Sequence, residues 1–171
     1  MVTPVYRECP GCGLRLPLSE ALADDRFNAS PECWAIYGEL TGYTIASAQT
    51  RRDNVFIHQH LVDAYAAQHA DEHQPPITVA FGLIGLYLAF EKGYTGKQVQ
   101  HMHMLLAQRS KVWPTFERPM QTGALTVQDV LLAQPGDERD ATLRRWGQSV
   151  WDAWSQQHAQ VQALIERMMA D

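Results

Sequence analysis

Two cysteines near the start of the chain have the spacing of a metal-binding or redox-active turn. Cys9 and Cys12 are separated by Pro10 and Gly11, and Gly13 follows them. Two thiolates at this spacing can face one concavity and lie about 2.3 Å from a shared metal ion. The alternative is a thioredoxin-like redox pair, which requires a strand before the motif and a helix beginning at the first thiol. Prolines and glycines flank the motif instead, so the pattern favours zinc.

A tetrahedral zinc site needs two further ligands, and Cys33 is the one remaining cysteine. It follows Ser30, a good helix N-cap, and Pro31, which suits the first helical position. Cys33 would then lie in the first turn of a helix, where backbone N–H groups stabilise a thiolate. The alternative is a buried thiol that packs as a small apolar side chain. The nearby pair of cysteines favours ligation.

The fourth ligand follows from the expected pairing of the first two helices. A short connection near residue 50 joins them, so they should be antiparallel neighbours. Cys33 then lies opposite residues 67–69, whereas His60 lies two turns away along the helix axis. The sequence therefore predicts His69 as the fourth ligand, with His60 as the alternative. The predicted ligand set is Cys9, Cys12, Cys33 and His69, a closed structural Cys3His zinc site with no open position for water or substrate.

A second group of side chains could carry chemistry of its own. His60 and Asp63 are three residues apart on the second predicted helix and share a face. With His158 they could form an open metal site or an acid/base centre. The alternative is a hydrogen bond that orients a buried histidine. The chain is also rich in aromatic residues that either pack in the core or line a ligand pocket: Trp113, Phe116, Trp146, Trp151 and Trp154.

These residues need a scaffold, and the hydrophobic periodicity predicts an all-α bundle of five or six helices. Residues 1–29 form an irregular segment that carries the Cys9/Cys12 turn, and residues 30–171 form the bundle, together one domain. The predicted helices span about 30–45, 55–70, 77–92 and 95–108, with a short helix from 126 and a long one over 138–169. Thr95 and Thr126 begin segments with the capping-box pattern.

Composition narrows the classes of partner. The formal net charge is −5 and basic residues are scattered, which argues against nucleic-acid binding. No stretch approaches 18 uninterrupted apolar residues, so we expect no membrane span. The first residues lack the apolar segment of a signal peptide, and we expect a reduced cytoplasm, where Cys-x-x-Cys motifs bind metals or cycle as thiols. The sequence does not identify a protein or small-molecule partner.

Four motifs resemble those of a bacterial protein family described as a domain of unknown function. They are CPGCG at 9–13, SPxCW at 30–34, VDAYxxQH at 62–69 and SVWxAW at 149–154. Members of that family tend to have a histidine in the third helix, where this chain has Phe81, and His-His where it has Gln157-His158. The resemblance implies the helical fold and the residues to examine, but it names no reaction.

Three functions are compatible with these sequence features. The favoured one is a helical domain with structural zinc that acts as a binding or regulatory module. The second is a metal-dependent enzyme of the transferase or hydrolase type, with its site around His60, Asp63 and His158. The third is a thiol redox protein that uses Cys9 and Cys12.

Overall fold

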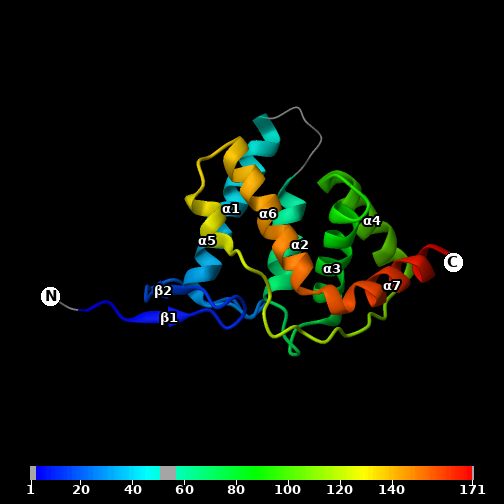
Figure 1. The fold of residues 1–171 in the computed structure, drawn as a ribbon, viewed down its shortest axis with the longest axis horizontal. Coiled ribbons are helices and arrows are strands. Elements are labelled where there is room, and N and C mark those ends of the chain that lie inside the picture. The colour runs from blue at the N-terminus through cyan, green and yellow to red at the C-terminus, as the bar shows by residue number, and fades with distance from the viewer. Residues whose placement is uncertain (1–2, 51–56, 171) are drawn as a thin grey trace.

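The structure is a computed structural model that describes residues 3–50 and 57–170. It is mostly helical, with seven α-helices and one two-stranded sheet in the described residues (Figure 1), and this confirms the predicted fold class. The elements are β1 (Tyr6–Glu8), β2 (Arg15–Pro17), α1 (Pro31–Thr50), α2 (Ile57–Gln68), α3 (Pro76–Phe90), α4 (Gly96–Arg109), α5 (Val127–Leu132), α6 (Asp137–Ala153), the 3-10 turn η1 (Ser155–Gln157) and α7 (His158–Ala170).

The N-terminal segment contains a short hairpin that the sequence analysis did not predict. β1 and β2 are antiparallel, and Tyr6 pairs with Pro17 and Glu8 with Arg15. The strands are three residues long and mostly exposed, so they lack the apolar alternation that reveals a strand in a sequence. The hairpin closes on the Cys9–Leu14 turn, where the Cys9 N–H donates to the Leu14 carbonyl over 2.8 Å.

Helix starts follow the predicted capping residues. Ser30 caps α1, since its Oγ accepts from the Cys33 N–H over 3.2 Å. Thr95 and Thr126 each form the predicted capping box, before α4 and α5. α1 extends to Thr50, beyond the predicted end at Ile45. The predicted start of the second helix, Val55, lies outside the described residues.

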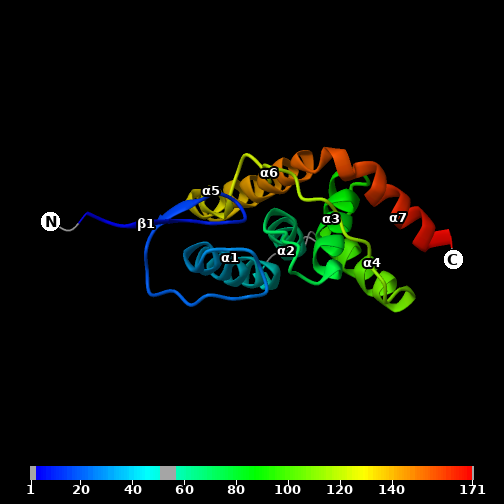
Figure 2. The same cartoon turned by 90° about the horizontal axis from the view of Figure 1, so that it is seen from below.

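Helix α2 is the centre of the molecule. It contacts α1, α3, α4 and α6, and Figure 2 shows it between α1 and α3 with α6 alongside. Trp146, Trp151 and Trp154 are fully buried in the bundle. Their indole N–H groups donate to Gln68 Oε1, Glu91 Oε1 and the Ala67 carbonyl, at 2.9, 2.7 and 3.2 Å respectively. These three tryptophans therefore belong to the core, where each buried N–H has an acceptor.

The predicted long C-terminal helix is wrong, because the chain bends at Trp154. The backbone there has φ −88° and ψ 16°, and η1 separates α6 from α7. His158 Nε2 donates to the Trp151 carbonyl over 2.8 Å, and the imidazole stacks on the Trp151 ring with centroids 3.7 Å apart. These contacts hold α7 at an angle to α6 and against α3. No helix in the described part of the chain has the length and apolar character of a membrane span.

Candidate metal centre

Four potential metal ligands from three separate segments meet at one place. Cys9 and Cys12 lie on the hairpin turn, Cys33 lies in the first turn of α1, and His69 directly follows α2. Their ligand atoms all lie within 4.8 Å of one another. The antiparallel pairing of α1 with α2 brings Cys33 and His69 together, as the sequence analysis expected. Such a group could hold a metal ion.

The spacing of the ligand atoms fits a tetrahedral ion. Zn–S bonds of about 2.3 Å and a Zn–N bond of about 2.0 Å place tetrahedral ligands about 3.8 Å apart for S–S and about 3.5 Å apart for S–N. The structure has Cys12 Sγ 3.9 Å from Cys33 Sγ. Cys33 Sγ lies 3.4 Å from His69 Nε2. Small adjustments would therefore complete the coordination shell.

His69 is fixed in the orientation that a ligand requires. Its Nδ1 lies 3.0 Å from the Tyr65 carbonyl, and a carbonyl can only accept. Nδ1 therefore carries the proton, and Nε2 presents its lone pair to the cysteines. The Tyr65 ring stacks on the imidazole with centroids 3.9 Å apart, so the ring cannot turn away.

Neighbouring donors stabilise negative charge on the sulfurs. The Ser30 N–H donates to Cys9 Sγ over 3.4 Å, and Tyr65 Oη lies 3.5 Å from Cys33 Sγ. Burial is the main cause that raises the pKa of Tyr65, so its hydroxyl stays protonated and can donate. Hydrogen bonds from Cys12 and Cys33 lower the pKa of Cys9. Hydrogen bonds with Cys12 and then with Cys9, followed by burial, raise the pKa of Cys33. A bound cation would allow all three thiols to ionise.

The cluster is enclosed by protein. Cys9, Cys33 and His69 are at most 1% exposed, and Cys12 is half-buried. Gly11 lies directly against the His69 ring and the Asn28 carbonyl, where a Cβ atom would have no room. The Gly11 carbonyl in turn accepts hydrogen bonds from a distant loop, residues 110–124.

Two side chains of that loop hold the cysteine turn. Arg118 Nη2 donates to the Gly11 carbonyl over 2.7 Å and to the Pro10 carbonyl over 3.1 Å. Thr122 Oγ1 donates to the Gly11 carbonyl over 2.9 Å. The loop also contacts α2, because Gln68 Nε2 donates to the Thr122 carbonyl over 3.3 Å, so it connects the ligand turn to the bundle.

A family model described as "Family of unknown function (DUF5946)" matches residues 7–155. The chain belongs to the DUF5946 family. The match confirms the resemblance to a family of unknown function, and the matched range includes all four cluster residues. No curated protein and no solved structure shows a significant match to the chain.

The second candidate site of this DUF5946 protein does not assemble in the structure. His60 is buried near Arg144 of α6. Burial is the main cause that lowers the pKa of His60 to about 4, and the positive charge of Arg144 contributes to the shift. Asp63 is directed toward Gly85 on α3, and His158 stacks on Trp151. Within residues 3–50 and 57–170, only the Cys3His group brings three or more His, Cys, Asp or Glu side chains into reach of one ion.

Asp63 instead belongs to a buried polar network that the sequence did not reveal. Gln59 Nε2 donates to Asp63 Oδ1 over 3.0 Å and lies 3.4 Å from His103 Nδ1. Phe81 stacks on His103 with ring centroids 4.6 Å apart. Burial raises the pKa of Asp63 well above its ordinary value. Burial also lowers the pKa of His103 to about 4, so this imidazole is neutral near pH 7.

The residues that support the metal ligands are not among those predicted from the sequence. Tyr65 lies on α2 four residues before His69, whose N–H donates to the Tyr65 carbonyl directly after the helix. The helical repeat therefore places both on one face, and this signal could have identified Tyr65. Arg118 and Thr122 lie more than 100 residues from the cysteine turn that they contact. No local pattern reveals such a contact.

Proposed function

We propose that the Cys3His cluster binds one zinc ion in a structural site. Three thiolates and one imidazole form a soft, nitrogen-containing donor set of the kind that zinc prefers over magnesium or calcium. The enclosed cluster of Cys9, Cys12, Cys33 and His69 carries this proposal, since its four ligand atoms lie within 4.8 Å of one another.

The number of protein ligands supports a structural role over a catalytic one. Catalytic zinc sites commonly have three protein ligands and keep one position for water or substrate. Here four protein ligands would fill the tetrahedron, and three of the four residues are fully buried. Zinc would connect the hairpin turn, the start of α1 and the end of α2.

We further propose that residues 1–171 form one helical domain that acts as a binding or regulatory module. This part of the proposal is supported by the closed donor set and by the separation of His60, Asp63 and His158. An open metal site needs several ligands around one ion, and His60, Asp63 and His158 do not form such a group in the described residues.

Elemental analysis of the purified protein tests the proposal, together with Cys33→Ala and His69→Ala variants. We expect one zinc per chain in the wild type, and zinc loss with a markedly lower melting temperature in both variants, because structural zinc binding contributes folding free energy. His101→Ala, an exposed histidine on α4, is the matched control and should keep its zinc.

Two results would overturn the proposal. One is a zinc-free Cys33→Ala protein with the wild-type melting temperature. The other is a wild-type protein without zinc whose Cys9 and Cys12 form a disulfide that mild reductant opens, which would support a thiol redox function.

A further inference from the structure

Cys12 is the least buried of the three cysteines in the metal cluster. Cys9 and Cys33 are at most 1% exposed, whereas Cys12 is half-buried. Cys12 also lines a hollow of about 330 Å3, together with the exposed Met120 and Gln121 of the loop of residues 110–124. A small solute in this hollow therefore has more access to Cys12 than to the other two cysteines.

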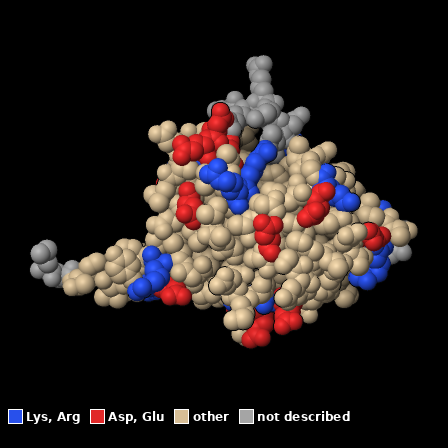
Figure 3. Space-filling model, in the orientation of Figure 1, with Lys and Arg blue, Asp and Glu red and all other residues tan. Residues whose placement is uncertain are grey.

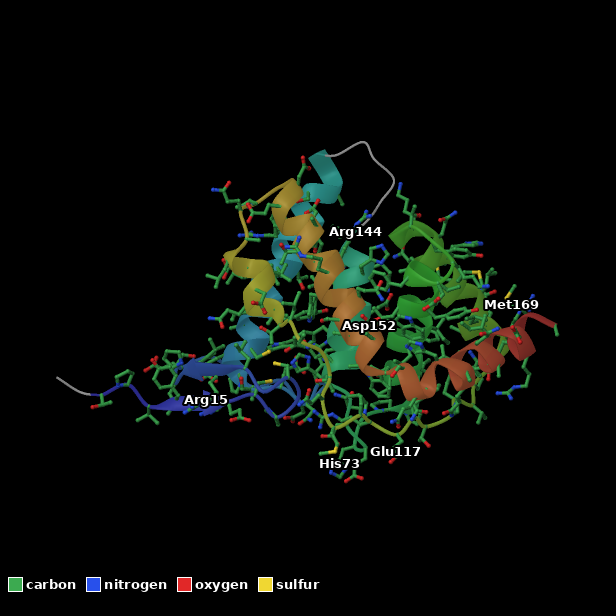
Figure 4. All side chains as sticks on the ribbon, in the orientation of Figure 1. Arg15, His73, Glu117, Arg144, Asp152 and Met169 are labelled. Carbon is green, nitrogen blue, oxygen red and sulfur yellow. The ribbon has the colours of Figure 1, made fainter. Side chains whose placement is uncertain are left out.

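The hollow lies at the base of the N-terminal hairpin. In Figure 4 the hairpin that carries Arg15 extends from the helices, and its turn lies where it meets them. Figure 3 shows the same segment protruding from the left of the molecule into solvent. Arg118 lines the hollow and donates to the Pro10 and Gly11 carbonyls. These hydrogen bonds make the opening beside Cys12 part of the folded surface.

A second thiol lies within reach of Cys12. Cys12 Sγ is 3.9 Å from Cys33 Sγ, and a disulfide bond of about 2.0 Å requires the two sulfurs to approach by about 2 Å. Cys33 Sγ is itself enclosed, with Tyr65 Oη at 3.5 Å and His69 Nε2 at 3.4 Å. Redox-sensitive cysteines combine an accessible thiolate with a neighbouring cysteine that completes a disulfide. Cys12 and Cys33 have this arrangement.

Bound zinc would keep Cys12 in its reactive form. A thiol that coordinates a metal ion is deprotonated, and the thiolate is the nucleophile in cysteine chemistry. A disulfide between Cys12 and Cys33 would leave only Cys9 and His69 as ligands, whereas a structural zinc site needs four. Oxidation that begins at Cys12 would therefore release the ion.

We propose that Cys12 is a modification site, at which a hydroperoxide starts the oxidation of the metal centre to a Cys12–Cys33 disulfide. This assignment rests on the proposed zinc function and supplies a means of regulating it. The disulfide would keep the hairpin turn joined to α1, whereas the connection to His69 after α2 would be lost. A thiol reductant with zinc would restore the site.

The reaction has two steps when the oxidant is hydrogen peroxide. The Cys12 thiolate attacks one peroxide oxygen, so that an S–O bond forms, the O–O bond breaks, and the departing hydroxide takes a proton to become water. The Cys33 thiolate then attacks Cys12 Sγ, the S–S bond forms, the S–O bond breaks, and a second hydroxide is protonated to water. Two thiolates thus lose two electrons to the peroxide, two protons are taken from solvent, and one zinc ion leaves.

Hydrogen peroxide added to the zinc-loaded, full-length protein tests this inference, with a chromophoric chelator to measure the released metal. We expect one zinc ion for each disulfide formed, and no release in buffer alone over the same time. Trypsin separates Cys33, in peptide 27–51, from Cys9 and Cys12, which share peptide 8–15. Peroxide should link these two peptides, and fragmentation in the mass spectrometer should place the link at Cys12. Dithiothreitol with added zinc should restore the original metal content.

A limiting amount of iodoacetamide tests the accessibility of Cys12 without an oxidant. In the zinc-loaded protein Cys12 should carry the label, and Cys9 and Cys33 should react only after denaturation. Met120→Leu is the matched control for peroxide, because it removes a fully exposed, oxidisable thioether that lines the same hollow. This variant should release zinc at the wild-type rate.

Zinc-loaded protein that forms no disulfide with peroxide would overturn the assignment of Cys12 and leave the zinc site in place. A disulfide that includes Cys9, first alkylation at Cys9 or Cys33, and zinc release that Met120→Leu abolishes would each overturn it as well. Protein that holds no zinc before peroxide is added would overturn the zinc proposal too, so the two failures are distinguishable.

Discussion

At the scale of single residues, Gly11 decides whether the cysteine turn can approach His69. A Cβ at this position would overlap the His69 ring and the Asn28 carbonyl, neither of which is the end of a flexible side chain. We expect Gly11→Ala to weaken zinc binding about 10- to 100-fold, the range for residues that support metal ligands. Competition with a chromophoric chelator measures this affinity.

Gly38→Ala is the control for the Gly11 substitution. Gly38 is exposed within α1, and a Cβ there meets nothing within 4 Å. Zinc affinity should stay unchanged, and the free energy of unfolding should rise by about 0.5–1 kcal/mol because alanine favours a helix interior. Equal zinc affinities for the two glycine variants and the wild type would contradict the role of Gly11.

At the scale of elements, α2 and α4 each bury one histidine, and this predicts a lower free energy of unfolding in acid. His60 and His103 have pKa values of about 4 in the folded protein, chiefly through burial, against about 6.5 in the unfolded chain. The unfolded chain therefore binds more protons as the pH falls from about 6.5 to about 4, and the free energy of unfolding decreases over this window. The pKa of Asp63 is raised in the folded protein, so protonation of this carboxyl group in acid increases the free energy of unfolding instead.

Urea unfolding from pH 7 to pH 4 isolates the contribution of His103 by comparison with His103→Gln. The decrease in unfolding free energy should be smaller in the variant by about 1–3 kcal/mol. His101→Gln, which alters an exposed histidine on the same helix, should follow the wild type. Identical pH profiles for wild type and His103→Gln would refute this explanation.

The helix starts and the bend at Trp154 show which features of the fold could be predicted from the sequence and which could not. Ser30, Thr95 and Thr126 carry local signals, so helix starts were predictable, and antiparallel pairing of two helices was enough to select His69. The bend at Trp154 depends on a contact between His158 and the Trp151 carbonyl that has no local pattern.

Sequence spacing could not show, for a related reason, that His60, Asp63 and His158 form no metal-binding group in the described residues. The rotation of α2 about its axis directs Asp63 toward α3, where Gly85 leaves room for its carboxyl group. Only the packing of the whole bundle sets that rotation. Sequence spacing shows which residues share a helix face, but not which neighbour that face meets.

At the scale of the whole molecule, the metal centre joins the N-terminal hairpin to the bundle. The packing of α3 on α2, where Gly82 lies against Ala66 and Ala67, uses none of the four ligands. After zinc removal by a chelator, we expect hydrogen exchange to rise first and most in residues 5–33. Residues 76–90 of α3 should keep their protection longest, because buried apolar contacts hold them.

Reloading the protein with zinc should restore the original exchange pattern. The wild type treated with buffer alone is the control. A uniform rise in exchange over hairpin and bundle, or no change at all, would contradict a role for the metal in fastening the hairpin.

X-ray absorption spectroscopy at the zinc edge tests the central claim most directly. We expect three sulfur ligands at about 2.3 Å and one nitrogen at about 2.0 Å, from Cys9, Cys12, Cys33 and His69. A first shell with fewer sulfurs, or with an additional oxygen from water, would show an open site and contradict the account.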